Sequence, residues 1–245
     1  MAGRMRIDIA AVSRTGPRAR NEDAHAWRDD GSHACMVVSD GAGGHGGGQV
    51  AARIAVDTVM QAFGRQPRSA VDGLRALVDE ANRAVVRGQQ ASAEVADMRA
   101  TVVLLAIDAD ARLARWAHVG DSRLYVLRDG RVHSRTRDHS LAQTLIDAGL
   151  ADESLLHAPA RGVLTASLGG AEAGEARVSA PLTLIAGDAL LLCTDGLWER
   201  LDDAQLVRAR DIAETAADWL ARIEAVADPS GDRDNATALA VIWNG

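Results

Sequence analysis

Short apolar runs and amphipathic stretches divide the chain into segments with two different periodicities. Runs too short for a helix, or alternating between apolar and polar residues, predict strands. These strands are expected at residues 6–12, 34–39, 101–107, 113–119, 124–127, 132–135, 176–179, 189–193 and 236–243. Apolar residues spaced along one helical face predict helices at 49–63, 70–86, 141–148 and 211–227.

The order of these segments indicates the fold class. Strands come first, then two helices, a run of strands, further helices and a last strand. Asp129-Gly130 between two predicted strands is a strong signal for a tight hairpin. Short connections of this kind favour antiparallel sheets with helices packed outside, which is an α+β fold. Residues 140–174 are turn-rich and predict a small flap, and we expect one domain over residues 1–245.

Composition narrows the classes of function. The net charge of -7 and the lack of a basic run argue against nucleic acid as a partner. All 27 basic residues are arginine, so Schiff-base chemistry and a phosphate-loop lysine are excluded. Cys35 and Cys193 lie in apolar runs, which predicts buried thiols. Without a signal-peptide core or a bilayer-length apolar run, we expect a cytoplasmic protein with no membrane partner. We also expect a monomer.

Five short acidic patches are the strongest chemical signal, and most of them lie at the end of an apolar run. They are Asn21-Glu22-Asp23, Ser39-Asp40-Gly41, Gly120-Asp121-Ser122-Arg123, Thr194-Asp195-Gly196 and Asp234-Asn235. Converging carboxylates without a Cys/His cluster are typical of an all-oxygen site for Mg²⁺ or Mn²⁺. The sequence therefore predicts a metal-dependent enzyme.

The glycine-rich stretch after the second predicted strand has a competing interpretation. Gly41, Gly43 and Gly46 match the dinucleotide-binding pattern G-x-G-x-x-G. A second parallel strand should then follow the helix, but another helix follows instead. A metal role for Asp40-Gly41 fits better, because glycine lets its carbonyl approach a cation. One Asp-Gly pair could be an ordinary turn; its recurrence at Asp195-Gly196 favours metal binding.

Six segments together carry a family resemblance. They are residues 18–24, 38–45, 117–123, 164–169, 193–198 and 234–237. In this order they resemble the metal-dependent Ser/Thr protein phosphatases of the PPM (PP2C) family, in their single-domain bacterial form. The resemblance spans nearly the whole chain. It implies a four-layer α-β-β-α sandwich of two antiparallel sheets flanked by helix pairs.

The same resemblance implies ligands for two Mn²⁺ or Mg²⁺ ions and for a third, weaker ion. These ligands are Glu22, Asp23, Asp40, Gly41, Asp121, Asp195 and Asp234. Asp40, Asp195 and Asp234 would hold the first ion, and Asp40 with the Gly41 carbonyl the second. Glu22 or Asp23 would reach that second ion directly or through water, and Asp121 would hold the third.

The implied reaction is hydrolysis of phosphoserine and phosphothreonine in proteins, which include a Ser/Thr kinase. Metal ions neutralise the phosphate and activate a bridging water for in-line attack. Arg18 would clamp the phosphate, Asp40 would bridge the ions, and His45 would either protonate the leaving group or support its loop. Arg20 could share the clamp or only lie at the surface. We expect structural roles for His118 and His139.

Two alternatives to a protein phosphatase remain, and so do three local departures from the family pattern. The chain could bind phosphoproteins without turnover, or hydrolyse small phosphoesters. Ala42, Gln49 and the run Arg99-Ala100-Thr101 differ from the residues usual in the family. None of them is an expected metal ligand, so we expect them to affect specificity or flap packing more than competence.

Overall fold

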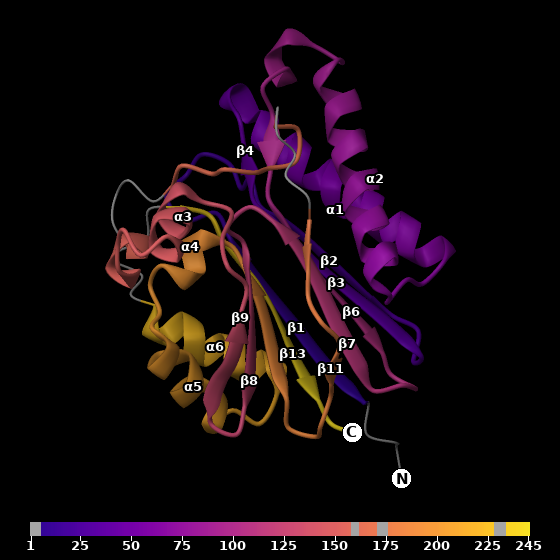
Figure 1. Cartoon of the computed structure of the whole chain (residues 1–245), viewed down its shortest axis with the longest axis vertical. Coiled ribbons are helices and arrows are strands. Elements are labelled where there is room, and N and C mark those ends of the chain that lie inside the picture. The colour runs from indigo at the N-terminus through magenta and orange to yellow at the C-terminus, as the bar shows by residue number, and fades with distance from the viewer. Residues whose placement is uncertain (1–5, 158–161, 171–175, 228–233) are drawn as a thin grey trace.

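Two antiparallel sheets face each other, and helices cover the outer face of each (Figure 1). The structure is a computed structural model that describes residues 6–157, 162–170, 176–227 and 234–245, without the side chain of His45. This arrangement confirms the α+β class and the four-layer α-β-β-α order.

Strand order defines the two sheets. The first sheet has the order β1 (Ile7–Arg14), β13 (Ala236–Trp243), β12 (Ala189–Cys193), β8 (Arg123–Arg128) and β9 (Arg131–Arg135). The second has the order β10 (Arg177–Val178), β7 (Leu113–Val119), β6 (Val102–Asp108), β3 (His33–Ser39) and β2 (Ala24–Asp29), and β11 (Leu182–Thr183) also pairs with β7. A separate short ribbon joins β4 (Gly41–Ala42) to β5 (Arg99–Ala100).

The helices form the outer layers. On the second sheet lie α1 (Gly47–Arg65) and α2 (Val71–Gln89); on the first lie α5 (Asp203–Asp211) and α6 (Ala216–Val226). The shorter helices are η1 (Gly44–Gly46), η2 (Ala93–Val95), α3 (Leu141–Asp147), η3 (Glu153–His157) and α4 (Asp195–Trp198).

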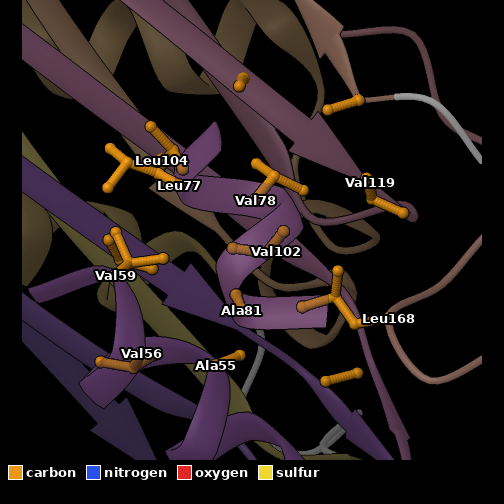
Figure 2. Close-up of a cluster of buried hydrophobic side chains, with 14 of the residues drawn as sticks. Ala55, Val56, Val59, Leu77, Val78, Ala81, Val102, Leu104, Val119 and Leu168 are labelled. Atoms are coloured by element: carbon orange, nitrogen blue, oxygen red, sulfur yellow. The ribbon is translucent and has the colours of Figure 1, made fainter. Parts of the chain in front are cut away.

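Strand periodicity explains how one strand serves two cores. Side chains of β6 alternate: Val103 and Leu105 join the core between the sheets, whereas Val102 and Leu104 pack under the helices. Figure 2 shows Leu104 close to Leu77 and Val102 close to Val78, both of α2. Each fully buried aliphatic side chain of this kind contributes about 1.5–3 kcal/mol. Both faces of β6 are buried, which explains its continuous apolar run.

Most predicted elements are confirmed within one or two residues at each end. The hairpin at Asp129-Gly130 is confirmed too, since both residues have positive φ and Arg128 pairs with Arg131. Two of the elements longer than five residues were missed, together with several shorter strands and helical turns. The edge strand β2 has no clear alternation of apolar and polar residues. Helix α5 has little apolar periodicity, although Asp202 and Gln205 form a capping box at its start.

The predicted helix over 211–227 is wrong in its extent. The structure ends α5 at Asp211 and begins α6 at Ala216. The Thr215 side chain accepts a hydrogen bond from the Asp218 backbone N–H, so Thr215 caps a new helix. The predicted strand over 176–179 is likewise shorter, covering only Arg177–Val178.

The predicted flap over 140–174 is described only in part. It contains α3 and η3, and Leu164 and Leu168 bridge to Ser140 and Ala100. Residues 158–161 and 171–175 lie outside the described residues. None of the helices in the described ranges combines the length and apolarity needed to cross a bilayer.

Candidate metal centre

The acidic patches predicted from sequence converge where several strands begin or end. Asp40 follows β3, Asp121 follows β7, and Asp195 follows β12. Burial raises the pKa of Asp40 well above its usual range, and the nearby carboxylates of Asp195, Asp23 and Asp121 raise it further. Asp40 and Asp195 also share a side-chain hydrogen bond. Four predicted ligands therefore form one cluster of like charge.

Two other members of the cluster show the same effect. Burial, with Asp195 and Asp138 next in effect, raises the pKa of Asp121 to about 7. Burial also raises the pKa of Asp23 to about 7, although hydrogen bonds from Thr237 and Thr194 oppose the shift. Each carboxylate thus lacks enough nearby positive charge to keep its ordinary pKa.

Asp23 and Glu22 occupy different parts of the site. Asp23 Oδ2 accepts a hydrogen bond from the Thr194 hydroxyl at 3.0 Å, while its buried Oδ1 has no hydrogen-bond partner among the described residues. Glu22 interacts with Arg18 and Asp234 instead, and burial raises its pKa. The sequence left open whether Glu22 or Asp23 serves the second ion. In the structure, Asp23 interacts with Asp40 and Asp195, and Glu22 does not.

These groups fit a hard divalent cation. Carboxylate oxygens dominate the donor set, and an unpartnered buried oxygen is available on Asp23. Within the described ranges, no three His, Cys, Asp or Glu side chains already have the spacing of a ligand shell. The Asp40–Asp195 hydrogen bond requires a shared proton, and a cation bound there would take the place of that proton.

A cavity of about 330 Å³ opens over this cluster. Asp40, Asp121 and Asp195 contribute its acidic side. Arg99 on β5 lines it as well, and so does Leu164 from the flap segment. The cavity therefore connects the carboxylates with the run Arg99-Ala100-Thr101, which departs from the family pattern, and with the predicted flap.

Arg18 lies beside a predicted metal ligand. Its Nη2 donates to Asp234 Oδ2 at 2.7 Å, and its side chain is 54% exposed. Arg18 lines a separate shallow pocket with Arg20, Glu22 and Asn235. The structure therefore brings the predicted phosphate clamp to the edge of the acidic cluster. Its contact with phosphate stays a prediction.

Sequence reasoning missed the residues that hold the acidic loops in place. Thr101 Oγ1 accepts from the Asp40 backbone N–H at 3.0 Å, and the Thr101 N–H donates to the Asp40 carbonyl at 2.8 Å. Asn235 Oδ1 accepts from the Glu22 N–H, while its Nδ2 donates to the carbonyls of Thr15 and Arg20. One amide thus ties the N-terminal loop to the start of β13, a role its donor and acceptor groups allow.

A buried network of hydrogen bonds and ring stacking holds the Asp121 backbone in place. Arg123 makes two hydrogen bonds to Asp138, at 2.9 and 2.8 Å, and donates to the Tyr125 hydroxyl. Its guanidinium lies 3.4 Å from the centroid of the Trp198 ring. Trp198 Nε1 in turn donates to the Asp121 carbonyl at 3.0 Å. The motif arginine therefore acts in the core and not on a substrate.

The three histidines singled out from sequence differ in what the structure says of them. His118 Nε2 hydrogen-bonds the Arg137 carbonyl, and His139 Nδ1 accepts from the Gly120 N–H. Burial, with His118 nearby, lowers the pKa of His139 to about 4, so it is neutral near pH 7. Both bond to backbone groups, as structural roles require. The side chain of His45 lies outside the described residues, and its role as proton donor stays a prediction.

The two Asp-Gly pairs need glycine because backbone lies against them. A Cβ on Gly41 would overlap the Gly48 carbonyl at the start of α1. A Cβ on Gly196 would overlap the Asn235 carbonyl. Close backbone packing thus explains both glycines. The predicted contact of the Gly41 carbonyl with a metal stays a prediction.

Gly196→Ala is expected to damage the site more than a surface Gly→Ala change. The added methyl group would push residues 235–236 away, and with them Asp234 and the Asn235 hydrogen bonds. We expect roughly a 2–4 kcal/mol loss of stability, as for overpacking or a strained backbone. Urea unfolding would measure it. Gly162→Ala is a matched control, because nothing lies within 4 Å of its added Cβ; equal losses in both variants would contradict the explanation.

Comparisons with known proteins agree with this geometry. The family described as "Protein phosphatase 2C" matches residues 13–240. The serine/threonine protein phosphatase PstP of Mycobacterium tuberculosis is 31% identical over 239 residues, which cover 94% of this chain and 45% of the relative. The chain thus spans about half the length of that curated relative. The serine/threonine phosphatase stp of Listeria welshimeri is 29% identical, with 93% of this chain and 92% of the relative covered.

Solved structures show the same fold. A crystal structure of Mycobacterium tuberculosis PstP aligns with a TM-score of 0.86 at 28% identity, covering 98% of this chain and 99% of that chain. The PstP catalytic domain in complex with two manganese ions aligns with a TM-score of 0.83 at 28% identity, covering 98% and 99%. Because the family match covers most of the sequence and the predicted motifs meet at one site, this chain belongs to the protein phosphatase 2C family.

Proposed function

We propose that this chain hydrolyses phosphoserine and phosphothreonine esters in proteins, with divalent cations held by its carboxylate cluster. The observation that carries the proposal is the convergence of Asp23, Asp40, Asp121 and Asp195. Burial, and after it the charge of neighbouring carboxylates, raises the pKa values of Asp23, Asp40 and Asp121. Buried like charges are costly, and such clusters occur at sites that use them. The phosphatase names and the manganese complex of the relatives support the same activity.

Different residues of the chain would bind the cations, orient the phosphate and hold the ligand loops in place. Asp40, Asp195 and Asp234 would hold one cation, and Asp40 with Asp23 and the Gly41 carbonyl a second, with Asp121 available to a third. Bound there, such cations neutralise phosphate charge and make a water nucleophilic near neutral pH. Arg18 orients the phosphate through its planar fork of donors. The buried support from Thr101 and Trp198 keeps the Asp40 and Asp121 loops in place before substrate arrives.

Phosphate release from a phosphothreonine peptide tests the proposal. The protein is treated with a chelator and then assayed with and without Mn²⁺. We expect release that requires Mn²⁺ and is lost in Asp195→Asn. The folded state of the variant is checked by circular dichroism. Release independent of any divalent cation would contradict the metal role.

Two other outcomes would favour the alternatives. Folded protein that binds the phosphopeptide without turnover under any divalent cation would be a phosphoprotein-binding regulator. Faster release from free nucleotides than from phosphopeptides would indicate a small-molecule phosphoesterase. A Ser/Thr kinase is the expected source of its substrates, and the same assay on an autophosphorylated kinase tests that partner.

Arg18→Ala is expected to raise KM about tenfold with a smaller change in kcat. Losing hydrogen bonds to a charged group costs roughly 1.5–3 kcal/mol, and part of that loss is screened at this half-exposed position. Steady-state kinetics on a phosphothreonine peptide would measure both constants. Arg20→Ala makes the same change in net charge within the same pocket and is expected to have less effect. An unchanged KM in Arg18→Ala would remove Arg18 from phosphate binding.

A further inference from the structure

Arg99 is a cationic side chain at the wall of the acidic cavity. It belongs to β5, which pairs with β4 directly after Asp40. The same cavity is lined by Asp40 and Asp195 on one side and by Leu164 of the flap segment on another. An arginine in this place faces any molecule that enters the cavity.

Strand geometry sets the direction of the Arg99 side chain. Arg99 is exposed and Ala100 is buried, so β5 turns its arginine away from the core. Ala42 is the direct partner of Arg99 in the β4–β5 register. Side chains of directly paired residues lie on the same face. The small side chain of Ala42 therefore leaves room for the long stem of Arg99 over the ribbon.

The guanidinium of Arg99 has unused hydrogen-bonding capacity. Within the described ranges it makes no hydrogen bond and no ion pair, unlike Arg18 with Asp234 and Arg123 with Asp138. A guanidinium carries five N–H donors in a planar fork that matches carboxylate and phosphate groups. Arg99 is thus available to an anionic group that comes from outside the chain.

Arg99 and Arg18 lie in different pockets around the same carboxylates. Arg18 lines the shallow pocket with Glu22, whereas Arg99 lines the larger cavity beside the flap segment. A phosphoryl group held at Asp40 would leave the neighbouring residues of its peptide to run into that larger cavity. At roughly 3.3–3.6 Å per extended residue, an arginine side chain reaches groups about one to three residues away.

We propose that Arg99 is a specificity-determining residue that receives an acidic group flanking the phosphorylated residue of the substrate. The group is a carboxylate or a second phosphate, since both offer the oxygen pair that a guanidinium binds. This inference rests on the proposed phosphatase function and deepens it. Ala100 bridges to Leu168, and Thr101 holds the Asp40 loop by a hydrogen bond. In this short segment Ala100 and Thr101 are therefore structural, whereas Arg99 would contact the substrate.

The test compares kcat/KM on three phosphothreonine peptides of one backbone sequence. One has neutral flanks, one has glutamates within three residues on either side, and one has a second phosphoserine there. The wild-type chain is expected to prefer both acidic peptides. Arg99→Ala should lose about two- to fivefold on the acidic peptides and less than about 1.5-fold on the neutral one, as for an exposed ion pair. Arg99→Glu should reverse the preference.

Arg131→Ala is the matched control. Arg131 is exposed and lies at the end of the β8–β9 hairpin away from Asp121. Its replacement by alanine makes the same change in net charge as Arg99→Ala. It should leave all three ratios unchanged. High salt should weaken the wild-type preference, because ions screen exposed charges. The two acidic peptides separate a carboxylate from a phosphate as the preferred group.

Three results would overturn the inference. Arg99→Ala could lower kcat/KM equally on all peptides, which would make Arg99 a ligand of the reacting phosphate or a general electrostatic aid. The peptide ratios could also stay as in the wild type while release continues, which would remove Arg99 from recognition and leave the phosphatase function intact. No release from any peptide by the wild-type chain would instead overturn the proposed function together with this inference.

Discussion

Asp40→Asn is expected to abolish Mn²⁺-dependent phosphate release and, at the same time, to stabilise the chelator-treated protein. Asp40 lies among Asp23, Asp121 and Asp195, and burial, followed by their charges, raises its pKa. An asparagine keeps the shape and can hydrogen-bond Asp195 without a shared proton. The substitution thus removes the burial cost and charge repulsion of the Asp40 carboxylate, which stabilises the fold. It also removes a metal ligand from the site.

The pH dependence gives this prediction a sign. A carboxyl whose folded pKa is raised above its unfolded value of 3.8 stabilises the fold at low pH and loses that contribution as pH rises through the folded pKa. The gain from Asp40→Asn should therefore be larger at pH 8 than at pH 5. Each kcal/mol corresponds to about 2–4 °C in Tm for a chain of this size.

Thermal unfolding in chelator at both pH values, with phosphate release in Mn²⁺, measures the two effects. We expect at least about a thousandfold loss of activity, since metal charge stabilisation is worth several kcal/mol. Asp129→Asn is the control, because it makes the same change at the exposed hairpin turn. A lower Tm in Asp40→Asn would mean that its charged form stabilises the fold, and near-normal release would reject Asp40 as a ligand.

Arg123→Met is expected to cause the largest loss of stability, about 3–5 kcal/mol. It would leave Asp138 buried without its partner, and the Arg123 and Asp138 side chains are only 2% and 3% exposed. It would also remove the stacking on Trp198, whose Nε1 holds the Asp121 carbonyl. Denaturant unfolding of the wild-type chain and of Arg123→Met would measure the loss of stability.

A double substitution separates charge from packing. Arg123→Met with Asp138→Leu removes both charges, and replacing a buried ion pair by apolar groups is often close to neutral. The double variant should therefore recover most of the stability lost in Arg123→Met. If both variants are equally unstable, packing and the Tyr125 and Trp198 contacts outweigh the charge pair. Arg222→Met is a control at a partly exposed i,i+4 pair with Asp218 and should cost less than about 1 kcal/mol.

The sequence predicted most of the fold because each layer leaves a local pattern. The apolar runs of β6 and β12 predicted strands, which the structure buries on both faces, and Asp129-Gly130 predicted its hairpin. Patterns failed where local sequence is ambiguous. The edge strand β2 buries only Ala24 fully and has no clear alternation of apolar and polar residues. The apolar spacing across residues 211–227 continued through a break that the Thr215 cap imposes.

Residue type and order also predicted the acidic site. Carboxylates after apolar strands indicated an oxygen site, and family resemblance indicated which of them converge. What the sequence left open was the arrangement within the site: whether Glu22 or Asp23 joins the Asp40–Asp195 pair, and what Arg123 contacts. These depend on groups far apart in the chain, such as Thr194 with Asp23 and Trp198 with Asp121.

The sequence by itself determined the period of each strand and helix, the α+β class and the chemical type of the site, because neighbours along the chain set those properties. Only the tertiary structure decided which charges meet. It brought Arg99 to the cavity wall, paired Arg18 with Asp234, and buried Arg123 against Asp138. Electrostatic energy depends on distance in space and on burial, and neither can be read from separation along the chain.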